Sequence, residues 1–394
     1  MPDSSGARVF DDLPEEVVLD QILVRLPPKD VLRCRAVRKS WRSGTSTDKF
    51  ILDHHRRQPS LPILEGRKGI CRLPILSGAG APTDKKIELI VQYAPDTRFA
   101  VVHHDSCDGL LILSQQDDFY ICNPATRRCA SLPHPPLRPD RSAVTVVGFY
   151  RHHTSGEHRV LWELYSLPSI SDVAVELPDY IVLTVGSGQP RLIQWRTVSE
   201  KDSFFKLNRF PEKRFCGIEF SYCPPIHHRG NLHWARGLNI TVFDTVAETF
   251  RQMSRPAQLG NLVALLDMGG ALALCSTTVT FDVWVLQDYD AETWGFRYRI
   301  NLLAMVASPP LDFQVNPFLK MVAINERELL IEMGGRLLHC DVHGVFLGNV
   351  KSKEYVYFWT LTTHRLQESM ISLPLSERKG EDFVNKEPPF LIVL

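Results

Sequence analysis

The sequence has few features that would place the protein in a membrane or in an oxidising compartment. No stretch of its 394 residues approaches the ~20 consecutive apolar residues that a membrane-spanning helix needs. The segment from Met1 to Arg8 lacks the apolar core of a secretion signal. The nine cysteines are odd in number and include no C-x-x-C pair, which favours reduced, mostly buried thiols over a disulfide framework. We therefore expect the protein in the cytosol or the nucleus.

Net charge and the common catalytic motifs are also missing. Lys plus Arg and Asp plus Glu each number 45, so no overall charge attracts the chain to nucleic acid or to an anionic membrane. The sequence contains no G-x-S-x-G, H-E-x-x-H, Walker or G-x-G-x-x-G motif. These absences predict a non-catalytic protein without a cofactor. We expect local surface patches, and not the overall charge, to determine which partners it binds.

Individual residues with reactive side chains do not form a convincing site. The histidine pairs His103-His104 and His152-His153 flank predicted strands, where exposed turn residues are expected. Cys107 is a possible nucleophile, but the sequence supplies no base for it. A metal site is conceivable in one segment, but its spacing does not match a zinc knuckle, and we predict no metal. The residues of that segment are Cys216, Cys223, His227, His228 and His233.

The first fifty residues differ from the rest because they predict short helices. Asp11 and Asp12 can cap a helix that starts near Pro14, and Glu15 complements the positive end of its dipole. Pro27 disfavours continuation of this helix and opens a second start. The head therefore consists of short, closely connected helices.

The first of these helices carries apolar residues on two sides. On a wheel of 100° per residue, Val17 and Val24 fall nearly opposite the main apolar face. A unit of about forty residues rarely buries enough surface to be stable alone. We therefore expect the second apolar side of the helix to bind a partner protein. Burial of both sides within a larger domain is the alternative. The main face contains Val18, Leu19, Ile22, Leu23 and Leu26.

A basic cluster on the head could be interpreted as a nucleic-acid patch. No aromatic residues alternate with it, so a solvated face or a complement to an acidic partner is the better interpretation. The cluster consists of Arg35, Arg38, Lys39 and Arg42.

From about Leu61 onward the sequence predicts an all-β region. Short apolar runs alternate with Gly, Pro, Asn and Asp, and they have the length and composition of strands. Examples are Leu110 to Leu113, Phe119 to Cys122, Val144 to Tyr150, Ile240 to Phe243 and Val283 to Leu286.

The strands recur in a repeated pattern. In this pattern a turn that contains glycine precedes one strand, and a polar turn follows the strand after it. The glycine turns are Asp108-Gly109, Arg229-Gly230, Gly269-Gly270 and Gly334-Gly335, and the polar turns begin at Asn123, Asp244 and Tyr289. Glycine suits positions with positive φ, and Asn or Asp closes a turn. Such repetition favours a β-propeller, with an irregular sandwich as the alternative.

The order and spacing of the head residues resemble the F-box motif. The resemblance rests on Leu13-Pro14-Glu15-Glu16, Ile22-Leu23, Leu26-Pro27-Pro28-Lys29, Val31, Arg35, Val37, Lys39-Ser40-Trp41 and Phe50. It implies a module of three short helices that docks to a Skp-family adaptor of a cullin–RING ubiquitin ligase. The residues implied at the adaptor contact or in the core beneath it are Leu13, Pro14, Leu23, Leu26, Pro27, Val31, Val37 and Trp41.

One departure from the F-box pattern concerns the residues after Trp41. The family has an apolar pair where this chain has Gly44 and Thr45, and both are poorer helix formers. We therefore expect the last helix of the F-box to fray and the affinity for the adaptor to be lower than is typical of the family.

The β region resembles the F-box-associated domain that follows many plant F-boxes. The resemblance rests on Ser106 to Leu111, Cys122 to Arg127, Leu132-Pro133, Val242 to Asp244, Glu248 to Phe250, Asp282 to Tyr289 and Trp294, and it thins past Pro310. It implies a domain that binds the protein to be ubiquitinated, with no common substrate and no identifiable substrate-binding residues.

The predicted layout is a disordered segment at residues 1–8, an F-box at 9–55 and an F-box-associated, propeller-like domain at 56–394. The predicted function is a non-catalytic substrate-recognition subunit. Two alternatives remain open. One is a propeller lectin or ligand-binding protein that stacks sugars on Trp195, Trp234 or Trp284. The other is an adaptor-bound scaffold without a role in degradation.

Overall fold

The structure, a computed structural model, describes most of the chain between residues 13 and 393. Within these limits it leaves out residues 67–68, 73–87, 95–100, 136–142, 166–178, 188, 194–223, 237–238, 261–262, 277–279, 308–309, 312–319, 334–335, 351–359 and 376–386. The expected cap at Asp11 and Asp12, the candidate metal ligands Cys216 and Cys223, and Trp195 lie outside the described residues.

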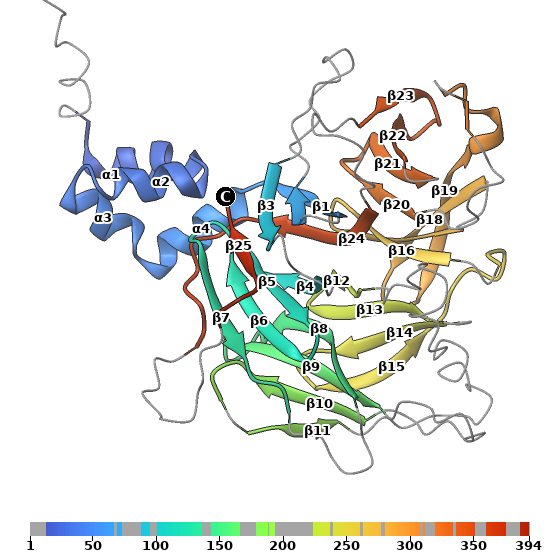
Figure 1. Ribbon diagram of the computed structural model, residues 1–394. Helices are drawn as coiled ribbons and strands as arrows, with labels where there is room; N and C mark the ends of the chain where they lie inside the picture. Colours follow the sequence, from blue (N-terminus) through green and yellow to red (C-terminus); the bar gives the residue numbers. More distant parts are fainter. Residues whose placement is uncertain are drawn as a thin grey trace, which may run out of the picture.

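A small helical head sits beside a ring of β-sheets (Figure 1). The first helix is irregular and comprises three segments, and three further helices follow it. No helix in the described part of the chain has the length and apolarity to cross a bilayer. The segments are α1 (Glu15–Val17), η2 (Val18–Ile22), η3 (Leu23–Arg25), α2 (Pro28–Cys34), α3 (Lys39–Thr45) and α4 (Asp48–Arg57).

The helix boundaries follow from capping and proline. Pro28 occupies the first turn of α2 and Pro27 precedes it in an extended conformation, as predicted. The hydroxyl of Thr47 accepts a hydrogen bond from the backbone N–H of Phe50 and so caps α4. This fourth helix adds to the three that the F-box resemblance implies.

Among the described residues the strands form six antiparallel sheets, which we number as blades in chain order. Blade 1 contains β1 (Ser60–Gly66), β2 (Gly69–Arg72), β3 (Glu88–Tyr93), β24 (Thr360–Gln367) and β25 (Phe390–Ile392). Blade 2 contains β4 (Val101–Cys107), β5 (Leu110–Gln115), β6 (Asp118–Asn123) and β7 (Arg128–Leu132). Blade 3 contains β8 (Ala143–Arg151), β9 (His158–Tyr165), β10 (Asp179–Thr184) and β11 (Arg191–Ile193).

The remaining blades repeat the four-stranded pattern. Blade 4 contains β12 (Ile226–His228), β13 (Asn231–Arg236), β14 (Asn239–Asp244) and β15 (Thr249–Met253). Blade 5 contains β16 (Val263–Met268), β17 (Ala271–Ser276), β18 (Thr280–Asp288) and β19 (Thr293–Asn301), which the short helix η6 (Leu302–Ala304) follows. Blade 6 contains β20 (Lys320–Ala323), β21 (Glu328–Met333), β22 (Arg336–Asp341) and β23 (Phe346–Asn349).

The ring is closed by strands from opposite ends of the β region. The strand β24 pairs with β1, with Leu61 opposite Leu366 and Leu64 opposite Leu361. On the other side of the same blade, β25 pairs with β3. Blade 1 is therefore assembled from the beginning and the end of the propeller sequence (Figure 1).

Apolar side chains fill the six spaces between neighbouring blades. Trp162 and Phe149 of blade 3 are fully buried against blade 2, and Phe243 of blade 4 is fully buried against blade 3. Because each strand of a blade presents one face to either neighbour, the strands appear in the sequence as nearly continuous apolar runs. The prediction of a small helical head followed by a β-propeller is confirmed.

The repeated glycine turns connect the innermost strand of a blade to the second strand. Backbone φ is positive at both Asp108 and Gly109, and the turns at Arg229-Gly230 and Gly269-Gly270 share this property. The fourth predicted turn, Gly334-Gly335, lies outside the described residues, between β21, which ends at Met333, and β22, which begins at Arg336.

The polar turns connect the third strand of a blade to the outermost one. The carboxylate of Asp244 accepts hydrogen bonds from the backbone N–H groups of Val246 and Ala247, both at 2.8 Å. Asp288 caps the equivalent turn of blade 5, and the side-chain oxygen of Asn123 accepts from the N–H of Thr126 in blade 2. These contacts give the repeated Asn and Asp residues a structural role.

One cysteine pair departs from the expected reduced thiols. Cys122 and Cys129 lie opposite each other on β6 and β7 and are joined as a disulfide. Their spacing of seven residues contains a hairpin turn, which the count of cysteines did not reveal.

The packing between blades yields a first prediction. Replacing Phe243 with Ala should lower the free energy of unfolding by about 3–5 kcal/mol, because it leaves a cavity between blades 3 and 4. Val246, 55% exposed in the following turn, provides the control, and Val246→Ala should change stability by less than about 0.5 kcal/mol. Urea denaturation measures both. Equal losses for the two variants would contradict the assigned core.

Candidate functional site

The residues that the F-box resemblance implies at the adaptor contact separate into two classes. Leu13 and Val37 are 36% and 66% exposed, and Pro14 and Pro27 are also exposed. Leu26 is half-buried. The other three are buried in the head and support the exposed residues from beneath: Leu23, Val31 and Trp41.

The prediction that the first helix carries apolar residues on two opposite sides is corrected by the structure. The segment η2 is a π-helical turn, in which the N–H of Leu23 bonds the carbonyl of Val18, five residues earlier. The wider turn and the tighter turn of η3 rotate Val24 inward, so this residue is 3% exposed and packs with Val18. Only Val17, 39% exposed, remains on the predicted outer side.

The expected fraying of α3 is also wrong. The helix continues to Thr45, whose hydroxyl is buried, donates to the carbonyl of Trp41 and accepts from the guanidinium of Arg35. Gly44 leaves room for Leu19, because a Cβ at this position would come within 2.5 Å of a Leu19 methyl group. Gly44 and Thr45 therefore serve the internal packing of the head.

The basic cluster of the head is divided between two elements. Arg35 follows α2 and donates to the carbonyl of Thr45 at 2.7 Å, while Arg38 precedes α3 and lies over the ring of Trp41. These contacts are internal to the head, so the expected single basic face is wrong.

A segment near the C-terminus attaches the head to the propeller. We call residues 367–371, which begin at the last residue of β24, the clasp. The amide of Gln367 donates to the carbonyl of Gln58, and the carbonyl of Glu368 lies 2.9 Å from Nδ1 of His55 in α4. Met370 is 3% exposed and packs in the core of the head.

Blade 2 holds the other side of the clasp. The amide of Asn123 donates to the carbonyls of Ser369 and Ile371 at 3.2 and 2.8 Å. The hydroxyl of Ser369 donates to the carbonyl of Asp108. Gly109 fits closely beneath, because a Cβ there would come within 2.8 Å of the carbonyl of Gln367. The motif residues Asp108, Gly109 and Asn123 thus position the C-terminal segment.

The carboxylate of Asp108 lies where the head, blade 2 and blade 3 meet. It is 3.1 Å from Nε2 of His158, 3.8 Å from Nε2 of His55 and 3.9 Å from the guanidinium of Arg151. Burial alone would raise the pKa of Asp108, but the hydrogen bond and charge of His158, together with the charges of His55 and Arg151, outweigh burial and lower the pKa. Asp108 is therefore an ionised junction residue.

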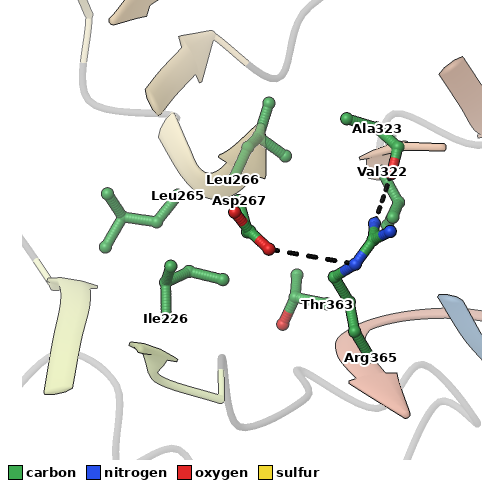
Figure 2. A pocket seen from close by; sticks show the side chains of 8 residues that line it. All are labelled: Ile226, Leu265, Leu266, Asp267, Val322, Ala323, Thr363 and Arg365. Atoms are coloured by element: carbon green, nitrogen blue, oxygen red, sulfur yellow. Dashed lines mark hydrogen bonds and ion pairs between the residues drawn. The ribbon is translucent and has the colours of Figure 1, made fainter. Parts of the chain in front are cut away.

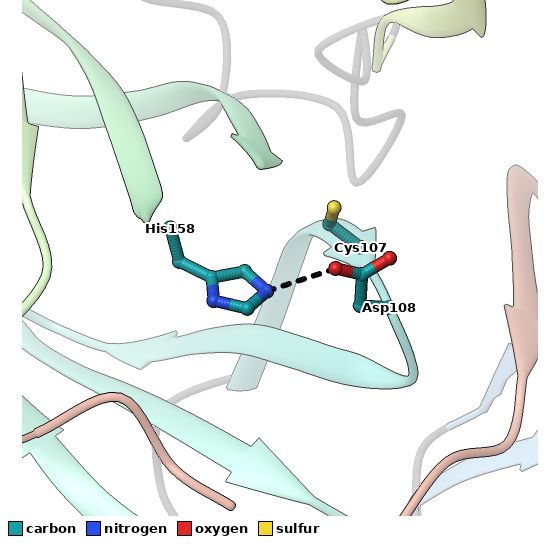
Figure 3. A group of neighbouring side chains, drawn as sticks. All are labelled: Cys107, Asp108 and His158. Carbon is teal, nitrogen blue, oxygen red and sulfur yellow. Dashed lines mark hydrogen bonds and ion pairs between the residues drawn. The ribbon is translucent and has the colours of Figure 1, made fainter. Parts of the chain in front are cut away.

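Cys107 lies beside this carboxylate and His158 (Figure 3). Possible ligand atoms of Cys107, Asp108 and His158 lie within 4.8 Å of one another. Burial, followed by the charges of Asp108 and Asp105, raises the pKa of the Cys107 thiol well above its ordinary value. A protonated thiol is a weak nucleophile and a weak metal ligand, and Arg151 competes with a cation for Asp108. The group fits an ion-paired junction best.

The centre of the ring contains another carboxylate, that of Asp105, which is fully buried with 1% of its surface exposed. It accepts a hydrogen bond from the backbone N–H of Phe149 at 2.7 Å and lies 3.3 Å from Nε2 of His227 and 3.5 Å from Nδ1 of His364. These groups belong to β8, β12 and β24, while Asp105 belongs to β4. One carboxylate therefore connects four blades.

The histidine predictions have mixed outcomes. His103 lies within β4, is 6% exposed and contacts the ring of His364 at a tilt, so its expected position in an exposed turn is wrong. His104 also lies within β4 and bonds the hydroxyl of Ser114. His152 lies in the turn between β8 and β9 and bonds Ser155, as expected of a turn residue.

A small pocket lies near the axis between blades 1, 4, 5 and 6 (Figure 2). Arg365 enters it from β24, lies 3.8 Å from Asp267 and donates to the carbonyl of Ala323. The space holds about one water molecule. It is far too small for a sugar.

Two of the three tryptophans assigned to a lectin site, Trp234 and Trp284, lie among the described residues and are packed against other residues. Trp234 is 2% exposed and lies between blades 3 and 4. Trp284 meets Phe296 edge to face at 5.6 Å and packs partly between blades 4 and 5. The candidate metal ligand His233 is buried and bonds Tyr289 and the carbonyl of Ile226.

Comparison with known families agrees with this arrangement. Residues 10–53 match the F-box-like family. Residues 81–308, more than half of the chain, match the F-box associated beta propeller domain. The chain belongs to the F-box associated β-propeller family.

Curated F-box proteins from Arabidopsis thaliana are similar over most of their length. F-box protein At5g49610 is 26% identical over 77% of this chain and 82% of its own. F-box/LRR-repeat protein At2g43260 is 24% identical over 76% of this chain and 69% of its own. A solved protein of unknown function from Bacteroides caccae has a TM-score of 0.41 at 11% identity, covering 79% of this chain and all of its own.

The placement of the F-box-associated domain at the C-terminus is corrected by these matches. The F-box is N-terminal, and the matched part of the associated domain follows it in the middle of the chain. Blade 6 and the closing strands β24 and β25 lie beyond the match and complete the propeller. The clasp also lies beyond it, so the resemblance could not indicate the residues that join the two domains.

The Asp105 network predicts a pH-dependent stability. Burial would raise the pKa of Asp105 and lower that of His227, but their mutual attraction outweighs both and shifts each pKa the other way. The Asp105 contribution is lost as pH falls below about 3.9, and the His227 contribution as pH rises above about 6.5. Asp105→Asn should therefore cost more unfolding free energy at pH 6 than at pH 8.

Urea denaturation at the two pH values measures this difference. Asp290→Asn, in the exposed turn before β19, is the matched control and should have the same small effect at both. A cost of Asp105→Asn that is equal at the two values, or larger at pH 8, would refute the proposed ion pair.

Proposed function

We propose that the protein is the substrate-recognition subunit of an SCF-type, cullin–RING ubiquitin ligase. Its F-box docks to a Skp-family adaptor and its propeller binds the substrate. The observation that carries this proposal is an F-box that leaves apolar residues exposed while a clasp holds it against a propeller. The F-box family match and the F-box relatives support the role in general.

The proposed adaptor surface consists of the exposed apolar residues of the head. Val37 lies in the connection between α2 and α3, and Leu13 and Val17 lie at the start of the first helix. Exposed apolar side chains on so small a module favour a protein partner. Pro14, Leu26 and Pro27 complete the proposed contact, while Leu23, Val31 and Trp41 hold its shape.

This role needs no catalytic residue in the chain itself. A receptor accelerates ubiquitin transfer by holding a lysine of its substrate near the charged conjugating enzyme, which raises the effective concentration of the two reactants. The half-buried Cys107 and the paired histidine and carboxylate side chains are occupied by structural contacts. Substrate binding by propeller loops, in the cytosol or the nucleus, completes the proposal.

A charge at Val37 tests the adaptor surface. Val37→Asp should weaken binding of a purified Skp-family adaptor at least tenfold, about 1.4 kcal/mol, because it buries an unpaired carboxylate in the contact. Since Val37 is 66% exposed, the thermal midpoint of the free protein should not change. Isothermal titration calorimetry and thermal unfolding measure the two quantities.

Leu303, which is 63% exposed in the short helix η6 after blade 5, provides the control. Leu303→Asp should leave adaptor affinity within about twofold. Trp41→Ala should weaken binding by a different route, since this residue is buried and its loss loosens the head. If wild-type protein does not bind the adaptor, or if Val37→Asp binds as well as wild type, the proposed surface is wrong.

A further inference from the structure

The apolar core of the F-box is incomplete without the C-terminal part of the chain. Met370 is 3% exposed and packs among Val18, Leu23, Val31 and Trp41. Its thioether sulfur also accepts a contact from the guanidinium of Arg35 at 3.8 Å. A residue more than 300 positions away in sequence is therefore part of the module that we propose binds the adaptor.

The clasp cannot reach this position independently of the propeller. It follows β24 directly, and β24 closes the ring by pairing with β1. Asn123 of blade 2 holds the backbone on both sides of Met370, through the carbonyls of Ser369 and Ile371. The side chain of Met370 is thus presented to the head by a segment that blades 1 and 2 both hold.

The head has few other means of stability. Its first helix is interrupted by a π-helical turn. The helices α2 and α3 have seven residues each, so these two short helices gain little stability from helix propagation. A module of this size depends on every buried side chain. Loss of Met370 would leave a cavity against Val31 and Trp41, two residues that support the proposed adaptor surface.

We propose that closure of the propeller by β24 delivers Met370 into the F-box core, so that the F-box becomes competent for adaptor binding only when the propeller is closed. This inference rests on the proposed adaptor binding and extends it. A chain with an open or misfolded propeller would then be a poor ligand for the adaptor. By thermodynamic linkage, adaptor binding would in turn stabilise the closed ring.

Two methionine variants separate this coupling from general destabilisation. Met370→Ala removes the contact with the head, whereas Met321→Ala removes a residue that is 2% exposed between blades 5 and 6. Met370→Ala should raise the adaptor dissociation constant at least tenfold, because the competent fraction of the F-box falls. Met321→Ala should leave it within about twofold. Titration calorimetry of full-length protein measures both.

A third variant tests the dependence on ring closure. Leu361 is 1% exposed, lies in β24 opposite Leu64 and packs between blades 6 and 1, where it is not part of the F-box core. Leu361→Ala should accelerate hydrogen exchange at the backbone amides of α2 and α3 at least tenfold in the free protein. Met321→Ala should not.

The outcomes distinguish the coupling from the proposed function. Hydrogen exchange needs no adaptor, so faster exchange in Leu361→Ala without any wild-type adaptor binding would support the coupling and reject the function. Unchanged exchange in both Leu361→Ala and Met370→Ala would overturn the coupling even if wild type binds. Circular dichroism verifies that each variant retains its strands, and Leu361→Val replaces Leu361→Ala if the latter does not fold.

Discussion

Met370 lies in the core of the F-box, and its position is the constraint on which the arrangement of the two domains depends. The residue reaches the head because β24 closes blade 1 and because Asn123 and Asp108 hold the clasp on either side. Head and propeller therefore share a core and hydrogen bonds, and the orientation of one sets the orientation of the other. For a receptor that acts by proximity, such a fixed geometry is the useful property, since it limits where a bound substrate can lie.

Two carboxylates, the buried one of Asp105 and the half-buried one of Asp108, provide the polar part of this framework. Asp105 connects four blades at the centre of the ring, and Asp108 meets side chains of α4 and blade 3 at the junction with the head. A buried carboxylate is tolerated only where hydrogen bonds and positive partners replace the water that it loses. The same contacts occupy His158 and His227, residues that in isolation suggest catalysis or metal binding. These carboxylate and histidine side chains therefore hold neighbouring blades, and the head, together.

Local sequence patterns predicted the elements well and their long-range contacts poorly. Glycine at positive φ and Asp or Asn at turn starts identified the hairpins, because these requirements act within a few residues. The π-helical turn at Val18–Ile22 could not be seen on an ideal wheel, so Val24 was placed on the wrong side. Met370 and His158 were missed because their partners are distant in sequence. The one available signal was indirect: Asp108 and Asn123 lie in the turn motifs of blade 2, and both bond the clasp.

The most direct test of the account is reconstitution of full-length protein with a purified Skp-family adaptor and a cullin–RING module, followed by size-exclusion chromatography with light scattering. The account predicts one species whose mass corresponds to one copy of each component, formed only when the adaptor is present. Elution of the chain by itself, with the adaptor and the cullin–RING module together in a separate peak, would contradict it.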